Sequence, residues 1–286
     1  MPADEGWRRR SIAFRRMSEA VSQGESARPG LIARILPRGW GDFIKQLVLF
    51  TVVDLLYEGT RGHSLGSLQV AFRHAGDVVS LERSMHIFTE LDVQHWVLAR
   101  PWALSIADFT YFHGHFVVTT VFLFWLYLRR NRHYYFIRNA IFVADGIALI
   151  GFTFFPTAPP RLLTWLGFTD TLDRYASINV YSGPIKDLAN PYAAIPSIHT
   201  CYAMITALTC FFLVKRMPLR IIWLLYPVLI VFSIVATGNH FWIDAMLGAT
   251  TAMIALGVAW VIESRFPSLP DSARRRMHLA PVSSSP

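Results

Sequence analysis

The chain has few cysteines and few charged residues for its length. Among 286 residues only Cys201 and Cys210 are cysteines, and 16% of the residues are charged. Both cysteines fall in one predicted helix, where nine residues correspond to about 13 Å because an α-helix rises about 1.5 Å per residue. A disulfide within that helix is therefore excluded, and no disulfide framework or cysteine metal site is indicated.

Acidic residues are scarce as well, and they form no cluster typical of a divalent-metal site. The chain contains 19 Asp and Glu against 27 Lys and Arg, which gives a net charge of +8. A basic protein can bind nucleic acid, but here the basic residues lie in short tracts between apolar segments. Such tracts orient membrane proteins. We therefore expect the membrane as a partner, no nucleic acid, and no metal or other cofactor.

Hydrophobic residues make up 53% of the chain and aromatic residues 14%. A helix needs about 20 mostly apolar residues to cross a bilayer, and six apolar runs approach that length. They span 42–58, 104–128, 136–155, 197–214, 219–237 and 240–262. The first run is the weakest because Lys45 and Asp54 lie within it. The predicted fold is all-α, an integral membrane six-helix bundle over residues 42–262.

The two ends of the chain are expected to be cytoplasmic tails, residues 1–41 and 263–286. No apolar segment follows the arginine-rich first tail closely enough for a cleavable signal, so that tail is either disordered or partly an amphipathic helix on anionic lipid. In this orientation the inner segments carry 19 Lys and Arg and the outer segments 7, as the positive-inside rule requires. The basic tail favours a bacterial plasma membrane, although a eukaryotic endomembrane fits as well.

Two segments expected on the outer side are long, 59–103 and 156–196. Apolar spacing in the first predicts two or three amphipathic helices on the membrane surface, with Glu82, Glu90 and Asp92 between and beyond the apolar positions. The second is rich in proline and glycine, which is typical of a loop. Long ordered loops often carry function.

A histidine and an aspartate, His240 and Asp244, lie four positions apart at the beginning of the last apolar run. Residues four apart share a helix face, so the Asp244 carboxylate can accept a hydrogen bond from one ring nitrogen of His240. The other nitrogen then keeps its lone pair. An imidazole held in this way is either a nucleophile or a general base.

The fourth apolar run opens with Pro196-Ser197-Ile198-His199. Proline suits the first turn of a helix, where free N–H groups and the helix dipole favour an anion. Ser197 offers a hydroxyl, and a protonated His199 can donate to a phosphate oxygen or protonate a leaving alkoxide. The alternative is a serine cap followed by a histidine that hydrogen-bonds a loop.

The third apolar run is followed by Pro156-Thr157-Ala158-Pro159-Pro160-Arg161, a rigid turn that ends in a guanidinium. The arginine fork binds two phosphate oxygens at once, whereas the alternative is an interfacial arginine that reaches lipid headgroups. His113 and His115 are further candidates, or structural histidines at the interface, and Asp145 is expected to be paired or protonated. All three motifs fall on the outer side, which predicts a single site.

These motifs resemble the signatures of the type 2 phosphatidic acid phosphatase superfamily, approximately Lys-x6-Arg-Pro, Pro-Ser-Gly-His and Ser-Arg-x5-His-x3-Asp on a six-helix membrane core. Here Phe154 stands at the lysine of the first signature, Ile198 at the glycine of the second and Ile234 at the arginine of the third. The Pro-x-Ala-Pro-Pro-Arg form and the stretch 111–138 are similar to the inositol-phosphorylceramide-synthase-like branch. The resemblance covers roughly residues 60–262.

The resemblance implies a two-step transfer through a phosphohistidine. His240 would attack phosphorus, Asp244 would orient the ring and stabilise the imidazolium, and His199 would protonate the leaving oxygen. The residues implied to hold phosphate oxygens are Arg161 and Ser197, with Lys186 first and then Arg174 or Asn239 in place of the missing lysine and arginine.

A lipid phosphate or phospholipid at the outer leaflet is the expected substrate. Water as the acceptor makes the enzyme a lipid phosphatase, whereas an alcohol such as inositol makes it a phosphotransferase. A non-catalytic lipid-binding or transport protein on the same scaffold is the alternative, and a vanadium-type oxidation enzyme is a more remote one.

Overall fold

A computed structural model describes residues 36–63, 68–171 and 192–266. Contacts divide the chain into two units, residues 1–48 and 49–286. In the first unit the described residues contain the beginning of helix α3, Gly39–His63. There Gln46 Nε2 donates to Asp42 Oδ1 at 3.2 Å, a hydrogen bond across one helical turn.

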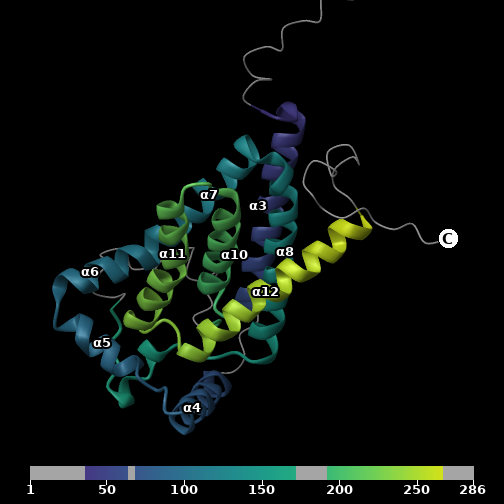
Figure 1. The fold of residues 1–286 in the computed structure, drawn as a ribbon. Helices are drawn as coiled ribbons and strands as arrows, with labels where there is room; N and C mark the ends of the chain where they lie inside the picture. The colour runs from purple at the N-terminus through teal and green to yellow at the C-terminus, as the bar shows by residue number, and fades with distance from the viewer. Residues whose placement is uncertain (1–35, 64–67, 172–191, 267–286) are drawn as a thin grey trace, which may run out of the picture. The chain divides into compact units, whose positions relative to one another are not determined.

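The second unit holds the other helices and the candidate site. Its elements in chain order are α4 (Leu68–Ser84), α5 (Glu90–Leu98), α6 (Pro101–Phe109), the π-helical η1 (Thr110–Gly114), α7 (His115–Arg129), α8 (Asn131–Phe154), the short 3-10 helices η2 (Pro160–Leu162) and η3 (Thr164–Leu166), α10 (Ile198–Leu213), α11 (Met217–Ala236) and α12 (Trp242–Arg265). Helices α7, α8, α10, α11 and α12 form a bundle, and α4 and α5 lie at one end of it (Figure 1).

Four stretches of the described residues are long and apolar enough to cross a membrane. They are Pro101–Arg129, Asn131–Phe154, Met217–Ala236 and Trp242–Arg265, and α10 is a shorter apolar helix. These five match the second to sixth predicted helices. Helix α3 is not among the candidate spans, because charged residues recur along it. A helical integral membrane protein is therefore supported, whereas the prediction of six spanning helices is not confirmed.

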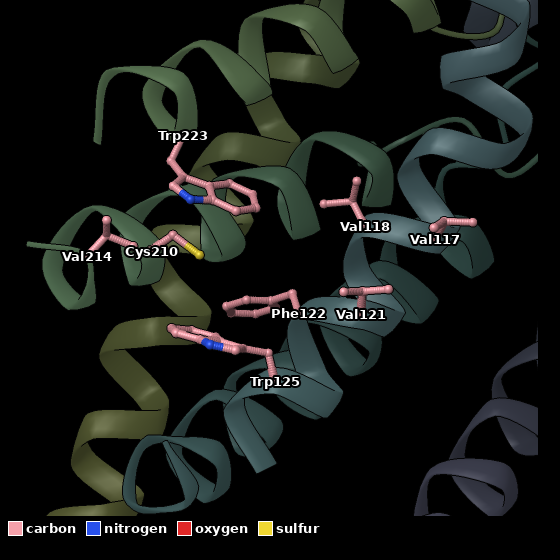
Figure 2. A pocket seen from close by; sticks show the side chains of 8 residues that line it. All are labelled: Val117, Val118, Val121, Phe122, Trp125, Cys210, Val214 and Trp223. Atoms are coloured by element: carbon pink, nitrogen blue, oxygen red, sulfur yellow. The ribbon is translucent and has the colours of Figure 1, made fainter. Parts of the chain in front are cut away.

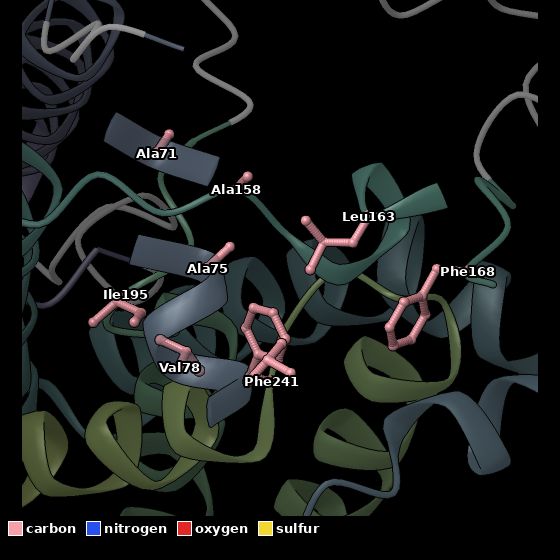
Figure 3. Packing of buried hydrophobic residues seen from close by; sticks show 9 residues of the cluster. Ala71, Ala75, Val78, Ala158, Leu163, Phe168, Ile195 and Phe241 are labelled. Atoms are coloured by element: carbon pink, nitrogen blue, oxygen red, sulfur yellow. The ribbon is translucent and has the colours of Figure 1, made fainter. Parts of the chain in front are cut away.

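Helices α4 and α5 lie within the segment for which amphipathic helices were predicted. One face of α4, with Ala71, Ala75 and Val78, is buried. This face packs in a cluster with Leu163 and with Phe241, which directly precedes α12 (Figure 3). The packing stabilises the end of the bundle, because it buries apolar side chains from α4, from the segment after α8 and from the segment before α12.

Helices α8 and α12 pack through small side chains. The fully buried alanines on these two helices are Ala140, Ala144, Ala148, Ala252, Ala255 and Ala259. Their spacing of three and four residues puts them on one face of each helix, and small residues let helix backbones approach closely. This packing brings the beginning of α12 near the segment that follows α8.

Candidate active site

His240 and Asp244 meet at the beginning of α12. His240 Nδ1 lies 3.2 Å from Asp244 Oδ2, and the same oxygen accepts a hydrogen bond from the backbone N–H of Phe241 at 2.9 Å. The Asp244 side chain is completely buried, and His240 is 5% exposed. With Nδ1 as the donor, Nε2 keeps a lone pair.

The expected contact exists, but its geometry differs from the prediction. His240 precedes α12, which begins at Trp242, so the pair does not share one helical face. Phe241 is the N-cap, and Asp244 at the third helical position reaches back to its N–H. A carboxylate in this position satisfies a backbone donor that the helix leaves unpaired, and here it also binds the imidazole.

His199 lies across from His240, with ring centroids 5.5 Å apart. The Tyr111 ring stacks on His199 at 4.9 Å, and the His115 ring lies 4.8 Å away. Tyr111 belongs to the π-helical stretch η1, and His115 follows it directly. Single π-helical turns inside a span are frequent at functional sites. Here the π-helical region supplies both rings that hold His199.

Ser197 joins the beginning of α10 to the beginning of α12. Its Oγ accepts from the N–H of Thr200 at 3.4 Å as the N-cap, and its own N–H donates to the Asp244 carbonyl oxygen at 3.1 Å. A Cβ on Gly248 would lie 2.3 Å from the Ser197 carbonyl oxygen. Glycine is therefore needed at position 248 for this approach, which fixes His199 relative to His240.

Arg161 is held against the turn that precedes His240. Its backbone N–H donates to the Gly238 carbonyl oxygen at 2.7 Å, and its Nη1 donates to Asn239 Oδ1. The guanidinium is 3.6 Å from Asp170 Oδ2, and the residue is 7% exposed. Gly238 has φ +68°, and a Cβ there would lie 3.2 Å from the Arg161 nitrogen, so this turn also requires glycine.

The structure thus brings together six of the seven residues proposed for the site. His240, Asp244 and Asn239 come from the turn into α12, Ser197 and His199 from the beginning of α10, and Arg161 from η2. Lys186, and the further candidate Arg174, lie outside the described residues. The roles assigned to these residues stay predictions.

Ile234 occupies the position of the superfamily's missing arginine. It is completely buried in an apolar cluster with Ala203 and Val235. Its carbonyl oxygen accepts hydrogen bonds from the N–H groups of Asn239 at 2.9 Å and His240 at 3.1 Å. Position 234 therefore shapes the turn through its backbone, and its side chain supplies no cation to the site.

Two buried glutamates at the site were not recognised as functional from the sequence. Glu82 Oε1 accepts from the Ile243 N–H at 2.9 Å, and Glu90 Oε1 accepts from the Trp242 N–H at 3.0 Å. Both side chains are 0% exposed. One signal was available for Glu82, which lies four positions after Val78 and thus on the apolar face of α4.

Burial, together with the neighbouring carboxyl groups of Glu90 and Asp244, raises the pKa of Glu82 to about 9, while the hydrogen bond from the Ile243 N–H opposes the shift. Glu82 is therefore protonated at neutral pH. Three carboxyl groups thus surround the beginning of α12, and at least one of them carries a proton there.

Asp145 in α8 was expected to be paired or protonated, and the structure supplies its partner. The Tyr202 hydroxyl of α10 donates to Asp145 Oδ1. The Tyr202 ring also stacks on His115, with centroids 5.9 Å apart. Neighbouring rings therefore connect the Asp145–Tyr202 hydrogen bond to His199, through stacking of Tyr202 on His115 and contact of His115 with His199.

A separate cavity of about 430 Å³ lies between α7, α10 and α11 (Figure 2). Its lining is Val117, Val118, Val121, Phe122, Trp125, Cys210, Val214 and Trp223. None of these residues carries a charge, so the cavity offers no group that would hold a phosphate. The histidine cluster lies at the beginning of α10, whereas the cavity is lined by Cys210 and Val214 at the end of that helix.

The chemistry available at the cluster follows from its geometry. His240 supplies an oriented ring nitrogen, and Arg161 supplies a cation. His199 supplies a second imidazole, whose ring centroid lies 5.5 Å from that of His240. The N-terminus of α10 adds backbone N–H groups and the positive end of a helix dipole, which favour an anion. This combination suits a reaction that builds up negative charge on phosphate oxygens.

Comparison with known families gives one match. A family model described as the PAP2 superfamily matches residues 76–258, more than half of the chain. Comparisons with curated proteins and with solved structures find no match. The family match supports a phosphatase-type enzyme that acts on lipid-like substrates, while the predicted inositol-phosphorylceramide-synthase-like branch stays a prediction. On this match and on the motifs gathered at the site, the chain belongs to the PAP2 superfamily.

Proposed function

We propose that this protein is a metal-independent enzyme that transfers a phosphoryl group from a lipid phosphate or phospholipid through a phosphohistidine at His240. The observation that carries the proposal is the buried pair of His240 and Asp244, with Nδ1 and Oδ2 3.2 Å apart, facing a second histidine ring at 5.5 Å. A site that only binds lipid has no need of an oriented nucleophile beside a second proton-transfer group.

In the first step His240 Nε2 attacks phosphorus, and the P–N bond forms as the P–O bond to the lipid breaks. The leaving oxygen takes a proton from His199, which must therefore enter the step as an imidazolium. Asp244 accepts the Nδ1 hydrogen bond throughout and stabilises the positive charge that develops on His240. The carboxylate also holds the ring in the tautomer that leaves Nε2 free to attack.

In the second step the roles of His199 reverse. Now neutral, it takes a proton from the acceptor hydroxyl, whose oxygen attacks phosphorus and breaks the P–N bond. Water as the acceptor releases inorganic phosphate, whereas an alcohol gives a new phosphate ester. We propose the inositol-phosphorylceramide-synthase-like branch because the first motif has the form Pro-x-Ala-Pro-Pro-Arg161. Water and an alcohol such as inositol both fit as the acceptor.

The charge on the phosphate would be neutralised by Arg161, Ser197 and Asn239. Arg161 has two hydrogen-bonding faces, and Asn239 already orients one of its nitrogens. The N-terminus of α10, which begins after Ser197, contributes the positive end of its helix dipole. Lys186 is proposed as a further cation in place of the superfamily's lysine. The basic inner segments favour a site on the outer side of the membrane.

The test is turnover of the purified protein on a panel of lipid phosphates and phospholipids, with and without inositol. Wild-type protein should release phosphate or form a new labelled lipid, and His240→Ala and His199→Ala should lose this activity while inserting normally. Asn131→Ala is a suitable control, because Asn131 lies at the beginning of α8, whereas Arg161 of the site follows the end of that helix. Undiminished turnover in both histidine variants would refute the proposal.

One observation favours the second candidate, a lipid-binding protein without catalysis. Ile234 is buried in apolar surroundings. The described residues therefore hold no cation at the position where the superfamily has an arginine. Vanadate distinguishes the two candidates, because it mimics the five-coordinate phosphorus of the transition state. An enzyme is inhibited by vanadate and binds it through His240, whereas a lipid-binding protein binds lipid equally well with and without it.

A further inference from the structure

The beginning of α12 is held by side chains from two helices that precede it by about 150 residues in the sequence. The N–H groups of Trp242 and Ile243 donate to Glu90 and Glu82, at separations of 152 and 161 residues. The indole Nε1 of Trp242 also donates to Thr89 Oγ1 at 3.0 Å. Both of these N–H groups are among those that a helix leaves without internal partners.

The N-terminal N–H groups of α12 are thus shared among three carboxyl groups. Asp244 takes the N–H of Phe241, Glu90 that of Trp242 and Glu82 that of Ile243. A single side-chain cap ordinarily suffices to begin a helix. Two additional, completely buried acids are costly to desolvate, so their presence calls for a role beyond helix capping.

The two glutamates fix the part of the chain that carries the proposed nucleophile. His240 directly precedes the three residues whose N–H groups are bound, and Asp244 directly follows them. Glu82 belongs to α4 and Glu90 to α5, so both helices restrain the same turn. A displacement of this turn would separate His240 from His199, which is held by α10 and the π-helical region.

We propose that Glu82 and Glu90 are positioning residues that hold His240 and Asp244 in the geometry for phosphoryl transfer. The inference rests on the function proposed above. It assigns a catalytic purpose to α4 and α5, beyond their packing on the end of the bundle.

Glu82 faces two further carboxyl groups. These are Glu90 from α5 and Asp244 from α12, and Asp244 in turn faces His240. Glu82 Oε1 accepts from the Ile243 N–H, while the second oxygens of Glu82 and Glu90 have no hydrogen-bond partner among the described residues. A proton on the second oxygen of Glu82 removes one negative charge from this buried group. Loss of that proton would leave like charges in contact in a buried site, and their repulsion would loosen the turn.

The first experiment compares kcat and KM for Glu82→Ala and Glu90→Ala with those for Asp77→Asn and Asp92→Asn. The controls lie on the same two helices, α4 and α5, and their side chains are exposed. We expect kcat to fall at least about tenfold in both alanine variants with KM changed less than about twofold, because a shift of the nucleophile by a fraction of an ångström lowers the rate without removing substrate contacts. The controls should match the wild-type protein.

Glu82→Gln separates positioning by a protonated group from a merely structural role. Its amide oxygen can accept from Ile243 and its NH2 group takes the place of the protonated oxygen, so it reproduces the protonated glutamate without titrating. We expect near-wild-type kcat at pH 7, and we expect kcat to fall more steeply near pH 9 in the wild-type protein than in the variant. A variant with the wild-type pH profile, or alanine variants with wild-type kcat, would overturn the inference while leaving the proposed function intact.

Hydrogen exchange at the N–H groups of residues 241–244 provides a readout that does not depend on activity. Exchange should become faster in Glu82→Ala and Glu90→Ala than in the two controls. If the wild-type protein turned over no substrate, the proposed function would fail, and unchanged exchange in the alanine variants would overturn the positioning role as well. Faster exchange in the alanine variants would support the restraint of this turn by Glu82 and Glu90, whether or not the wild-type protein turns over substrate.

Discussion

Substitution of Gly248 by alanine is predicted to inactivate the enzyme without unfolding it. The new Cβ would lie 2.3 Å from the Ser197 carbonyl oxygen and 3.1 Å from Thr200 Cβ, whereas an ordinary contact begins at 3.4 Å. The beginning of α10 must therefore move away from α12 by about 1 Å, the shortfall against ordinary contact. Misplacement of reacting groups by about 1 Å costs roughly a hundredfold in rate, so we expect kcat to fall by about that factor.

The same helix offers a matched control. A Cβ on Gly257 would meet no atom within 4 Å, and replacing glycine by alanine inside a helix stabilises it by up to about 1 kcal/mol. Initial rates on a short-chain lipid phosphate, measured in one detergent for both variants, give the comparison. Overpacking at position 248 should cost about 1–3 kcal/mol of stability, which thermal unfolding measures separately. A Gly248→Ala enzyme with kcat within about twofold of Gly257→Ala would refute the reasoning.

Three further predictions concern the charged groups of the site. Arg161→Lys loses the planar fork and its bond to Asn239, so kcat/KM should fall roughly ten- to a hundredfold in steady-state assays. Asp244→Asn removes the acceptor that sets the tautomer of His240, and kcat should fall on the order of 10³–10⁴-fold with the fold retained by circular dichroism. Glu82 has a pKa of about 9 in the folded protein against 4.5 for an ordinary glutamate. Since the unfolded chain loses this proton above about pH 4.5 and the folded chain keeps it until about 9, the stability contributed by the protonated group should fall as the pH rises across that window. Thermal unfolding of Glu82→Gln should lack this decline, and parallel pH dependences would contradict it.

The membrane character of the chain was readable from the sequence because it depends on composition and run length. Five of the six predicted helices match helices of the structure, since long apolar runs between basic tracts leave few other possibilities. The first run was the exception, and the charges at Lys45 and Asp54 give the reason. The beginning of α12 was misplaced by two residues, because Asp244 caps the helix and leaves His240 outside it.

The convergence of the three motifs was predictable from the side of the membrane on which each lies, but its geometry was not. The approach of Ser197 to Gly248 and of Arg161 to Gly238 depends on glycines that carry no signal of their own in the sequence. The contacts of Glu82 span more than 150 residues, and no local pattern encodes such a pairing. Only its place on the apolar face of α4 marked it as unusual.

The central claim is that His240 carries the phosphoryl group between donor and acceptor. The direct test is a rapid-quench single turnover with a lipid phosphate labelled on phosphorus. The quenched protein is digested under alkaline conditions, which preserve phosphohistidine, and the peptide that contains residue 240 is analysed by mass spectrometry. The account predicts a phosphoryl group on His240 that forms and decays within the turnover, and no label in His240→Ala. Complete consumption of the substrate with no phosphoryl group on His240 at any time, or with the label on another residue, would contradict it.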